Sequence, residues 1–228
     1  MKRKKIGCAD KQCFLCSGCL PEWTPAIEAA KETFLFNKGE TIFAEGDPVL
    51  GIYFVYEGSV KIHKHWGKDK ELIVRFAKTG DIIGHRGLGE IPLYPISATA
   101  LENTILCFVK IDFFRTTLQV NPRFTVNLLL FYADELQRSE KKMSMLAHMP
   151  VRGRIADALL SLSRLFGTDE NGAINISLSR QDLASYAGTT YETVFRTLAE
   201  FAELETIRFV NKSIVITQED QLIAFTQE

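Results

Sequence analysis

The pattern of apolar and polar residues divides the chain into a β-rich first half and a largely helical second half. From Phe34 to about Ile111, short apolar or alternating runs are separated by turns with glycine, proline or aspartate. Regularly spaced turns of this kind are typical of a small antiparallel barrel or sandwich. The predicted strands are Thr41 to Ala44, Gly51 to Glu57, Ser59 to His65, Glu71 to Phe76, Asp81 to Ile83, Ile96 to Ala100 and Thr104 to Lys110.

A single long helix is predicted after these strands. Neither proline nor glycine interrupts the segment from Pro122 to Pro150, and proline is tolerated in the first turn of a helix. Apolar side chains recur three and four apart along it, which is typical of a coiled-coil seam between subunits. The predicted dimerisation residues are Leu129, Tyr132, Leu136, Met143 and Leu146. A second apolar set, suited to packing on the chain's own barrel, comprises Phe124, Leu128, Phe131 and Met145.

Acidic residues also lie along this predicted helix, at Asp134, Glu135 and Glu140. Facing their two-fold mates, these side chains would repel one another. We therefore expect subunit association to depend on a bias supplied by another part of the chain.

The remaining residues predict a winged helix-turn-helix domain. Val151 to Phe166 is an amphipathic helix ended by Gly167, and Ala173 to Leu178 alternates like a short strand. Ser179 is a suitable N-cap for a helix that ends near Gly188, and a second helix follows to about Leu204. The wing is predicted as a β-hairpin over Ile207 to Thr217.

Glu192 and Arg196 are four residues apart and therefore share one face of the second of these helices. Glutamate can accept a hydrogen bond from cytosine N4, and arginine can donate two to guanine O6 and N7. An exposed ion pair within one helix has the same spacing. The pair therefore indicates base recognition only within the context of a helix-turn-helix.

Composition restricts the class of protein. The 228 residues are more than one compact domain usually contains, and 46% hydrophobic with 24% charged residues is typical of a globular protein. The net charge of −1 leaves any DNA-binding surface to a local patch. The longest largely apolar stretch, Val126 to Tyr132, is far below the roughly 20 residues that cross a bilayer. We expect a cytoplasmic protein without a membrane span.

Four of the five cysteines fall between Cys8 and Cys19. Cys13, Cys16 and Cys19 are spaced C-x2-C-x2-C, which lets three thiolates converge on one inorganic centre if a distant fourth ligand completes it. Zinc and a thiol switch use similar cysteine pairs and stay open as alternatives.

The run LASYAGTTYETVFR, from Leu183 to Arg196, closely resembles the helix-turn-helix signature of the CRP/FNR family of transcription regulators. The resemblance covers nearly the whole chain, because further fragments occur in the family's order. They are Gly39-Glu40, Glu45-Gly46-Asp47, the hairpin Val55 to Val60, Gly80-Asp81 and the helix start Val151 to Ala156.

The resemblance implies an α+β fold: a cyclic-nucleotide-binding-like antiparallel β-barrel (jelly roll), a long dimerisation helix and a winged helix-turn-helix domain. The expected boundaries are 1–30 for a cysteine-rich sensor segment, 31–120 for the barrel, 121–149 for the helix and 150–228 for the DNA-binding domain. It also implies a homodimer, not an enzyme, that binds a pseudo-palindromic double-stranded DNA operator and contacts RNA polymerase.

The DNA-binding residues implied by the resemblance are Thr189, Thr190, Tyr191, Glu192, Phe195 and Arg196. One of them departs from the family, which usually has serine or threonine immediately before the recognition arginine, where this chain has Phe195. The ring either contacts a thymine methyl group or turns into the core, so the half-site sequence stays open.

The position of Cys107 resembles that of the distant cluster cysteine in oxygen-sensing FNR proteins. This implies a [4Fe-4S] cluster on Cys13, Cys16, Cys19 and Cys107 that senses oxygen, nitric oxide or redox state. The last interval of the amino-terminal spacing is shorter than in those proteins, which makes Cys8 an alternative ligand. For Cys107 alone, a buried core thiol is the competing interpretation.

The cAMP-binding branch of the family pairs a Gly-Glu with an Arg-Ser or Arg-Thr around the cyclic phosphate. Here Gly89-Glu90 is present, but no arginine precedes Ser97, which argues against cAMP. Haem at His85 and another small-molecule effector stay open. A non-DNA ligand-binding barrel and a redox enzyme are weaker alternatives, because the chain has no P-loop, HExxH, nucleophile elbow or dinucleotide fingerprint.

Overall fold

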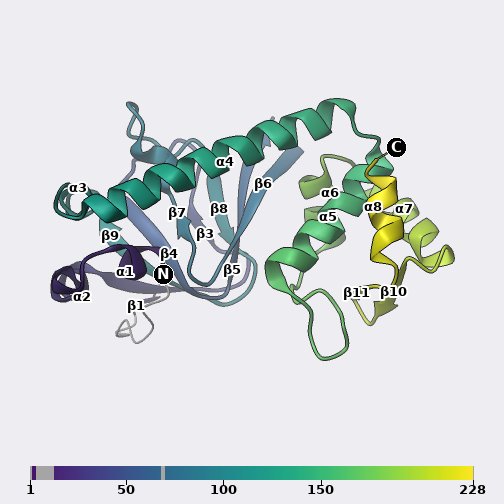
Figure 1. The fold of residues 1–228 in the computed structure, drawn as a ribbon, viewed down its shortest axis with the longest axis horizontal. Coiled ribbons are helices and arrows are strands. Elements are labelled where there is room, and N and C mark those ends of the chain that lie inside the picture. Colours follow the sequence, from purple (N-terminus) through teal and green to yellow (C-terminus); the bar gives the residue numbers. More distant parts are fainter. Residues whose placement is uncertain (1, 4–12, 68–69, 228) are drawn as a thin grey trace. The chain divides into compact units, whose positions relative to one another are not determined.

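The computed structural model describes residues 2–3, 13–67 and 70–227. The chain divides into two compact units, residues 1–65 with 74–137 and residues 66–73 with 138–228. The long helix α4 (Pro122–His148) contributes to both units (Figure 1). Its start and its end just before Pro150 confirm the predicted single helix.

Two antiparallel sheets form the β domain, in the strand orders β1-β2-β9-β4-β7 and β3-β8-β5-β6 (Figure 1). Each predicted strand of this region is confirmed within a few residues, and β1 and β2 are additions. The bounds are β1 (Lys2–Arg3), β2 (Glu32–Phe36), β3 (Thr41–Phe43), β4 (Gly51–Glu57), β5 (Ser59–Trp66), β6 (Lys70–Lys78), β7 (Ile82–Ile83), β8 (Ser97–Ala100) and β9 (Thr104–Lys110).

Strand β9 is buried on both faces, and this determines where its cysteine lies. Leu106 and Phe108 belong to the core between the sheets, whereas Cys107 and Val109 belong to a second apolar cluster. Successive residues of a strand face opposite sides, so the two sets separate cleanly. Cys107 therefore lies on the outer face of the first sheet.

Short helices cover that outer face. They are α1 (Phe14–Gly18), η1 (Pro21–Trp23), α2 (Thr24–Ala30) and α3 (Ile111–Val120). The Leu20 N–H donates to Asn121 Oδ1 at 2.9 Å, and Trp23 Nε1 donates to Thr117 Oγ1 at 3.1 Å while its ring stacks on Phe113. These contacts attach the cysteine-bearing segment to α3 and to the start of α4.

The carboxy-terminal unit contains the predicted helix-turn-helix and wing. Ser179 Oγ accepts from the Asp182 N–H at 3.0 Å, which confirms the predicted cap, and Thr190 Oγ1 accepts from the Thr193 N–H at 3.3 Å and caps the second helix. Its elements are α5 (Val151–Phe166), α6 (Arg180–Ala187), α7 (Tyr191–Glu203), β10 (Ile207–Val210), β11 (Ser213–Ile216) and α8 (Glu219–Phe225).

Gly188, between α6 and α7, is required by its conformation and by its surroundings. Its φ of 65° lies in the left-handed region, and a Cβ there would meet Leu146 Cδ2 at 2.4 Å. The last turns of α4 thus pack against the turn of the helix-turn-helix.

The strand predicted over Ala173 to Leu178 is wrong. Asp169 Oδ1 accepts from the N–H groups of Asn171 and Ala173, both at 2.9 Å, and closes a tight turn. Only single bridges follow, such as that between Ala173 and Val215. The alternation in the sequence reflects a segment that buries Ala173 and Ile174 without forming a ladder.

Candidate functional site

Three cysteines surround the short helix α1. Cys13 is its N-cap, with Sγ accepting from the Cys16 N–H at 3.3 Å, and Cys19 is its C-cap. All three side chains are half-buried. The Phe14 ring lies between them and α4, with edge contacts to Phe124 at 5.7 Å and Phe131 at 5.2 Å. Helix α1 thus presents its cysteines beside the first half of α4.

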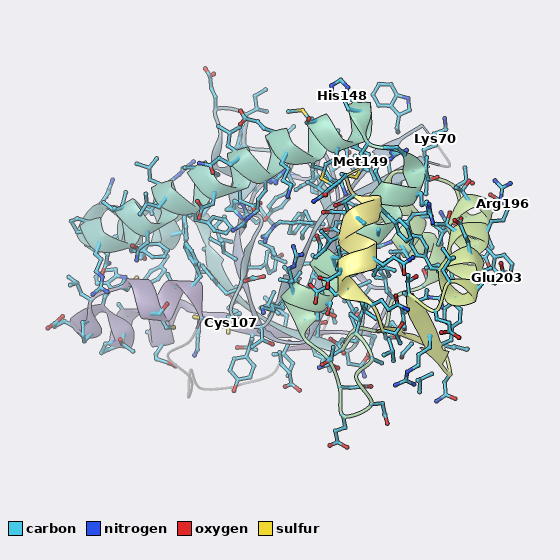
Figure 2. The ribbon with its side chains drawn as sticks, turned by 45° about the vertical axis from the view of Figure 1, so that its right-hand side comes forward. Lys70, Cys107, His148, Met149, Arg196 and Glu203 are labelled. Carbon is cyan, nitrogen blue, oxygen red and sulfur yellow. The ribbon has the colours of Figure 1, made fainter. Side chains whose placement is uncertain are left out.

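Cys107 approaches the same region from β9. It is 7% exposed and belongs to the apolar cluster against which Cys13, Cys16 and Cys19 pack (Figure 2). Residues almost ninety positions apart in the chain are therefore gathered in one cluster. The alternative ligand Cys8 lies outside the described residues.

The described cysteines do not form a compact group of zinc ligands. Tetrahedral zinc, bound at about 2.3 Å to each sulfur, would hold thiolates about 3.8 Å apart. Among the described residues, no cysteine belongs to a group of three potential ligands that all lie within 4.8 Å of one another. A four-iron cluster binds each thiolate to a different iron and separates the sulfurs further.

Burial, together with the nearby Cys13, raises the pKa of the Cys19 thiol to about 12. Cys107 is buried, whereas Cys13, Cys16 and Cys19 keep part of their surface exposed. The properties of a protein-bound cluster depend on such solvent exposure.

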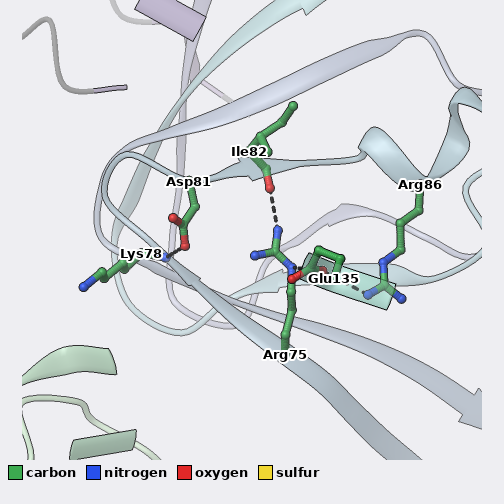
Figure 3. A network of polar contacts seen from close by, with 6 residues as sticks. All are labelled: Arg75, Lys78, Asp81, Ile82, Arg86 and Glu135. Carbon is green, nitrogen blue, oxygen red and sulfur yellow. Dashed lines mark hydrogen bonds and ion pairs between the residues drawn. The ribbon is translucent and has the colours of Figure 1, made fainter. Parts of the chain in front are cut away.

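A network of charged groups joins the β domain to the middle of α4 (Figure 3). Glu135 Oε2 lies 3.4 Å from Arg75 Nε and 3.1 Å from Arg86 Nη2, and the Glu135 side chain is only 7% exposed. Arg75 also donates to the carbonyl of Ile82. One carboxylate of α4 is therefore held by two arginines from separate parts of the barrel.

This network corrects the expectation that Glu135 faces a two-fold mate. The residue is buried against its own barrel, whereas Asp134 and Glu140 are exposed. The sequence contained a signal that we did not use: Glu135 follows Leu128 by seven residues and Phe124 by eleven, both of which are buried. A charged residue in that register is expected to need a buried partner.

A small cavity lies inside the barrel. The cavity measures about 10 Å³ and is lined by residues that include Arg75, His85, Arg86 and Tyr94. His85 is 2% exposed and packs against the rings of Phe131 and Tyr132, and its burial, with the charges of the two arginines, holds its pKa well below the usual value. The described residues leave space there for about one water molecule.

The predicted seam residues of α4 differ in their surroundings. Leu129, Leu136 and Met143, which are seven apart, are 68%, 60% and 61% exposed. Tyr132 instead donates its hydroxyl to the His85 carbonyl, and Leu146 packs at Gly188. Of the five predicted seam residues, only Leu129, Leu136 and Met143 therefore form an exposed stripe.

The predicted DNA-binding residues are brought together at the start of α7. Tyr191, Glu192, Phe195 and Arg196 are exposed, while Val194, Leu198 and Phe201 are buried. Figure 2 shows Arg196 on the outside of α7. Thr190 is exposed and Thr189 half-buried. Hydrogen bonds from the backbone N–H of Glu192 and from the Thr190 hydroxyl lower the pKa of the Glu192 carboxyl group. The carboxylate therefore stays a hydrogen-bond acceptor. Phe195 does not turn into the core.

An antiparallel β domain joined to a helix-turn-helix unit defines a DNA-binding transcription regulator. Residues 33–121 match the family model of the cyclic nucleotide-binding domain, and residues 153–225 match that of the Crp-like helix-turn-helix domain. Among the described residues, no helix combines the length and the apolarity that crossing a bilayer requires.

Individual proteins agree with these models. The chain is 30% identical to the cAMP-activated global transcriptional regulator CRP of Pasteurella multocida, over 85% of this chain and 97% of that protein. It is 27% identical to the transcriptional activator anr of Pseudomonas aeruginosa, over 94% and 91%. The structure of FixK2 from Bradyrhizobium japonicum superposes with a TM-score of 0.77 at 26% identity, over 86% and 96%. The chain belongs to the CRP/FNR family of transcription regulators.

Proposed function

We propose that this CRP/FNR-type regulator is a homodimer whose affinity for its operator depends on a [4Fe-4S] cluster held by Cys13, Cys16, Cys19 and Cys107. The observation that carries the proposal is that all four residues share one apolar cluster beside α4. When bound, the cluster supplies a centre that reacts with oxygen or nitric oxide. The chain supplies the four thiolates and apolar neighbours around them.

Contacts between α1 and α4 support a route from the cysteines to the dimer. Phe14 contacts Phe124 and Phe131, and a Cβ on Gly18 would meet Phe124 Cδ2 at 2.7 Å. Helix α1 therefore cannot shift without disturbing the first turns of α4. We infer that loss of the cluster releases α1, alters the pairing of the α4 helices and lowers operator affinity.

Cyclic AMP is not the proposed effector, although relatives named as cAMP-activated exist. A cavity of about 10 Å³ cannot admit a nucleotide unless the barrel opens. Tyr94, whose hydroxyl donates to the Gly51 carbonyl at 2.7 Å, occupies part of this interior. The same lack of space argues against haem at His85.

Metal analysis of protein purified without oxygen tests the proposed cofactor. We expect about four iron and four sulfide per protomer, with visible absorption that air removes, as a four-iron cluster requires. Stoichiometric zinc without sulfide would establish the zinc alternative. If the protein contains neither iron nor zinc, a thiol switch or another effector remains as the explanation.

The exposed face of α7 is the proposed DNA interface. Glu192 and Arg196 would meet base edges in the major groove, while Thr189, Thr190 and Tyr191 would contact phosphates at the start of the helix. The partner is a pseudo-palindromic double-stranded operator, and the bound dimer would contact RNA polymerase in the cytoplasm.

Replacing Arg196 with alanine is expected to weaken binding to an operator selected from randomised duplexes by about 5- to 150-fold. The reason is the loss of a bidentate contact to guanine, which is worth about 1 to 3 kcal/mol. Arg164→Ala, an exposed arginine on α5, is the matched control and should bind normally. Fluorescence anisotropy at fixed salt measures both. Equal affinities of the two variants would contradict the proposed interface.

Replacing Leu136 with aspartate is expected to raise the dimer dissociation constant at least about tenfold. The change removes apolar burial worth about 1.5 to 3 kcal/mol from each subunit and places two carboxylates near the two-fold axis. Leu130→Asp is the control, because Leu130 is equally exposed at 59% but lies about 100° around the helix from Leu129. Analytical ultracentrifugation should show a dimer for Leu130→Asp, and dissociation of both variants alike would refute the seam.

A further inference from the structure

Two phenylalanines on the carboxy-terminal unit are exposed at one place. Phe195 on α7 is 62% exposed and Phe209 on β10 is 43% exposed. Both line one hollow of about 460 Å³ between α7, the wing and the start of α6. Exposed apolar side chains that lie together in a hollow mark a candidate binding site.

The hollow also carries positive charge. Arg180, the first residue of α6, and Lys212, in the wing turn, line it. The guanidinium carbon of Arg180 lies 5.1 Å from the centre of the Phe209 ring, so the wing and α6 hold each other in place. Cations at the rim of an apolar hollow complement a ligand with a phosphate and an apolar group.

The position of Phe195 along α7 indicates which part of a DNA ligand its ring would contact. Phe195 follows Glu192 by three residues, so these two side chains share the face that is proposed to enter the major groove. Base edges there present donors and acceptors to polar side chains, and the 5-methyl group of thymine is their one apolar feature. An aromatic ring at this position can satisfy no base donor or acceptor, but it can cover a methyl group.

We propose that Phe195 reads the 5-methyl group of one thymine in each operator half-site, while Arg180 and Lys212 bind the phosphate of the strand that enters the hollow. This inference rests on the proposed DNA interface and adds to it the identity of a base that the chain selects. The same hollow would accept 5-methylcytosine at that position and would disfavour unmethylated cytosine.

The test removes the methyl group and the ring separately. In an operator selected with the wild-type protein, each thymine of the half-site is replaced in turn by deoxyuridine, which lacks only the methyl group. At one position we expect about a fourfold loss of affinity, and about fifteenfold when both half-sites are changed, because the burial of one methyl group is lost at each site. Phe195→Ser should bind the thymine and deoxyuridine operators equally.

Phe209→Ser provides the control within the hollow. It removes an exposed ring of the wing, so it should weaken both operators by the same factor and keep the difference between them. Circular dichroism melting of each variant checks the fold, which an exposed residue should leave intact.

The outcomes separate this inference from the proposed function. If Phe195→Ser keeps the loss on deoxyuridine substitution, or if no thymine responds while the operator still binds, the methyl reading is overturned and DNA recognition by α7 stands. If no operator can be selected at all, the proposed interface itself fails. Loss of the methyl effect in Phe195→Ser alone supports the inference.

Discussion

Replacing Cys107 with serine is expected to prevent the cluster from forming. Under anaerobic conditions, the affinity for the operator should then fall at least about tenfold. Serine retains the size of cysteine but is a poor iron ligand, so cluster assembly should fail while the β domain folds. Couplings between an effector site and a second site typically lie between about 5- and 150-fold. Loss of the cluster is measured by iron and sulfide content and by visible absorption. Loss of operator affinity is measured by fluorescence anisotropy in a glove box.

Cys8→Ser is the matched control for this experiment. It lies in the same cysteine-rich segment, and we expect it to retain iron, sulfide and binding. If Cys107→Ser retains iron, sulfide and operator binding while Cys8→Ser loses them, Cys8 is the fourth ligand and the proposed ligand set is contradicted. Full anaerobic affinity after replacing Cys13, Cys16, Cys19 and Cys107 together would refute control of the regulator by a cluster.

Replacing Glu135 with alanine is expected to lower the free energy of unfolding by about 3 to 5 kcal/mol. The change leaves Arg75 and Arg86 without the carboxylate that both contact, and an uncompensated buried charge is costly. Urea denaturation followed by circular dichroism measures the loss. A change below about 1 kcal/mol would show that water replaces the carboxylate without cost.

Two further variants define the cause. Glu140→Ala removes an exposed carboxylate from the same helix and should change stability by no more than about 0.5 kcal/mol. Glu135→Leu, made together with Arg86→Leu, replaces part of the charge network by apolar side chains. We expect the double variant to recover part of the loss, because paired buried charges stabilise little relative to apolar packing.

The stability of this network bears on the proposed switch. The cysteines contact α4 through Phe14, while Glu135 attaches the same helix one to three turns further along. A change at α1 that moves α4 would have to act against these ion pairs. Glu135→Ala is therefore also expected to alter the concentration dependence of dimer formation.

The order of elements followed from local chemistry that the sequence displays directly. Gly188 permits a left-handed turn, Ser179 and Thr190 cap helices, and Pro122 can begin a helix. These effects act over a few residues, so strands, the long helix and the helix-turn-helix could be predicted from them. The strand over Ala173 to Leu178 failed because a side-chain turn at Asp169 replaced the ladder.

The sequence by itself determined which residues carry the chemistry: the spacing of Cys13, Cys16 and Cys19, and the face that Glu192 and Arg196 share. Only the tertiary structure decided which distant groups meet. Cys107 joins the amino-terminal cysteines because strand alternation turns it outward under α1. Glu135 pairs with Arg75 and Arg86, and Phe195 with Phe209 lines a hollow. Periodicity indicates which face of an element is buried, but not what lies opposite it, because that depends on packing between segments remote in the chain.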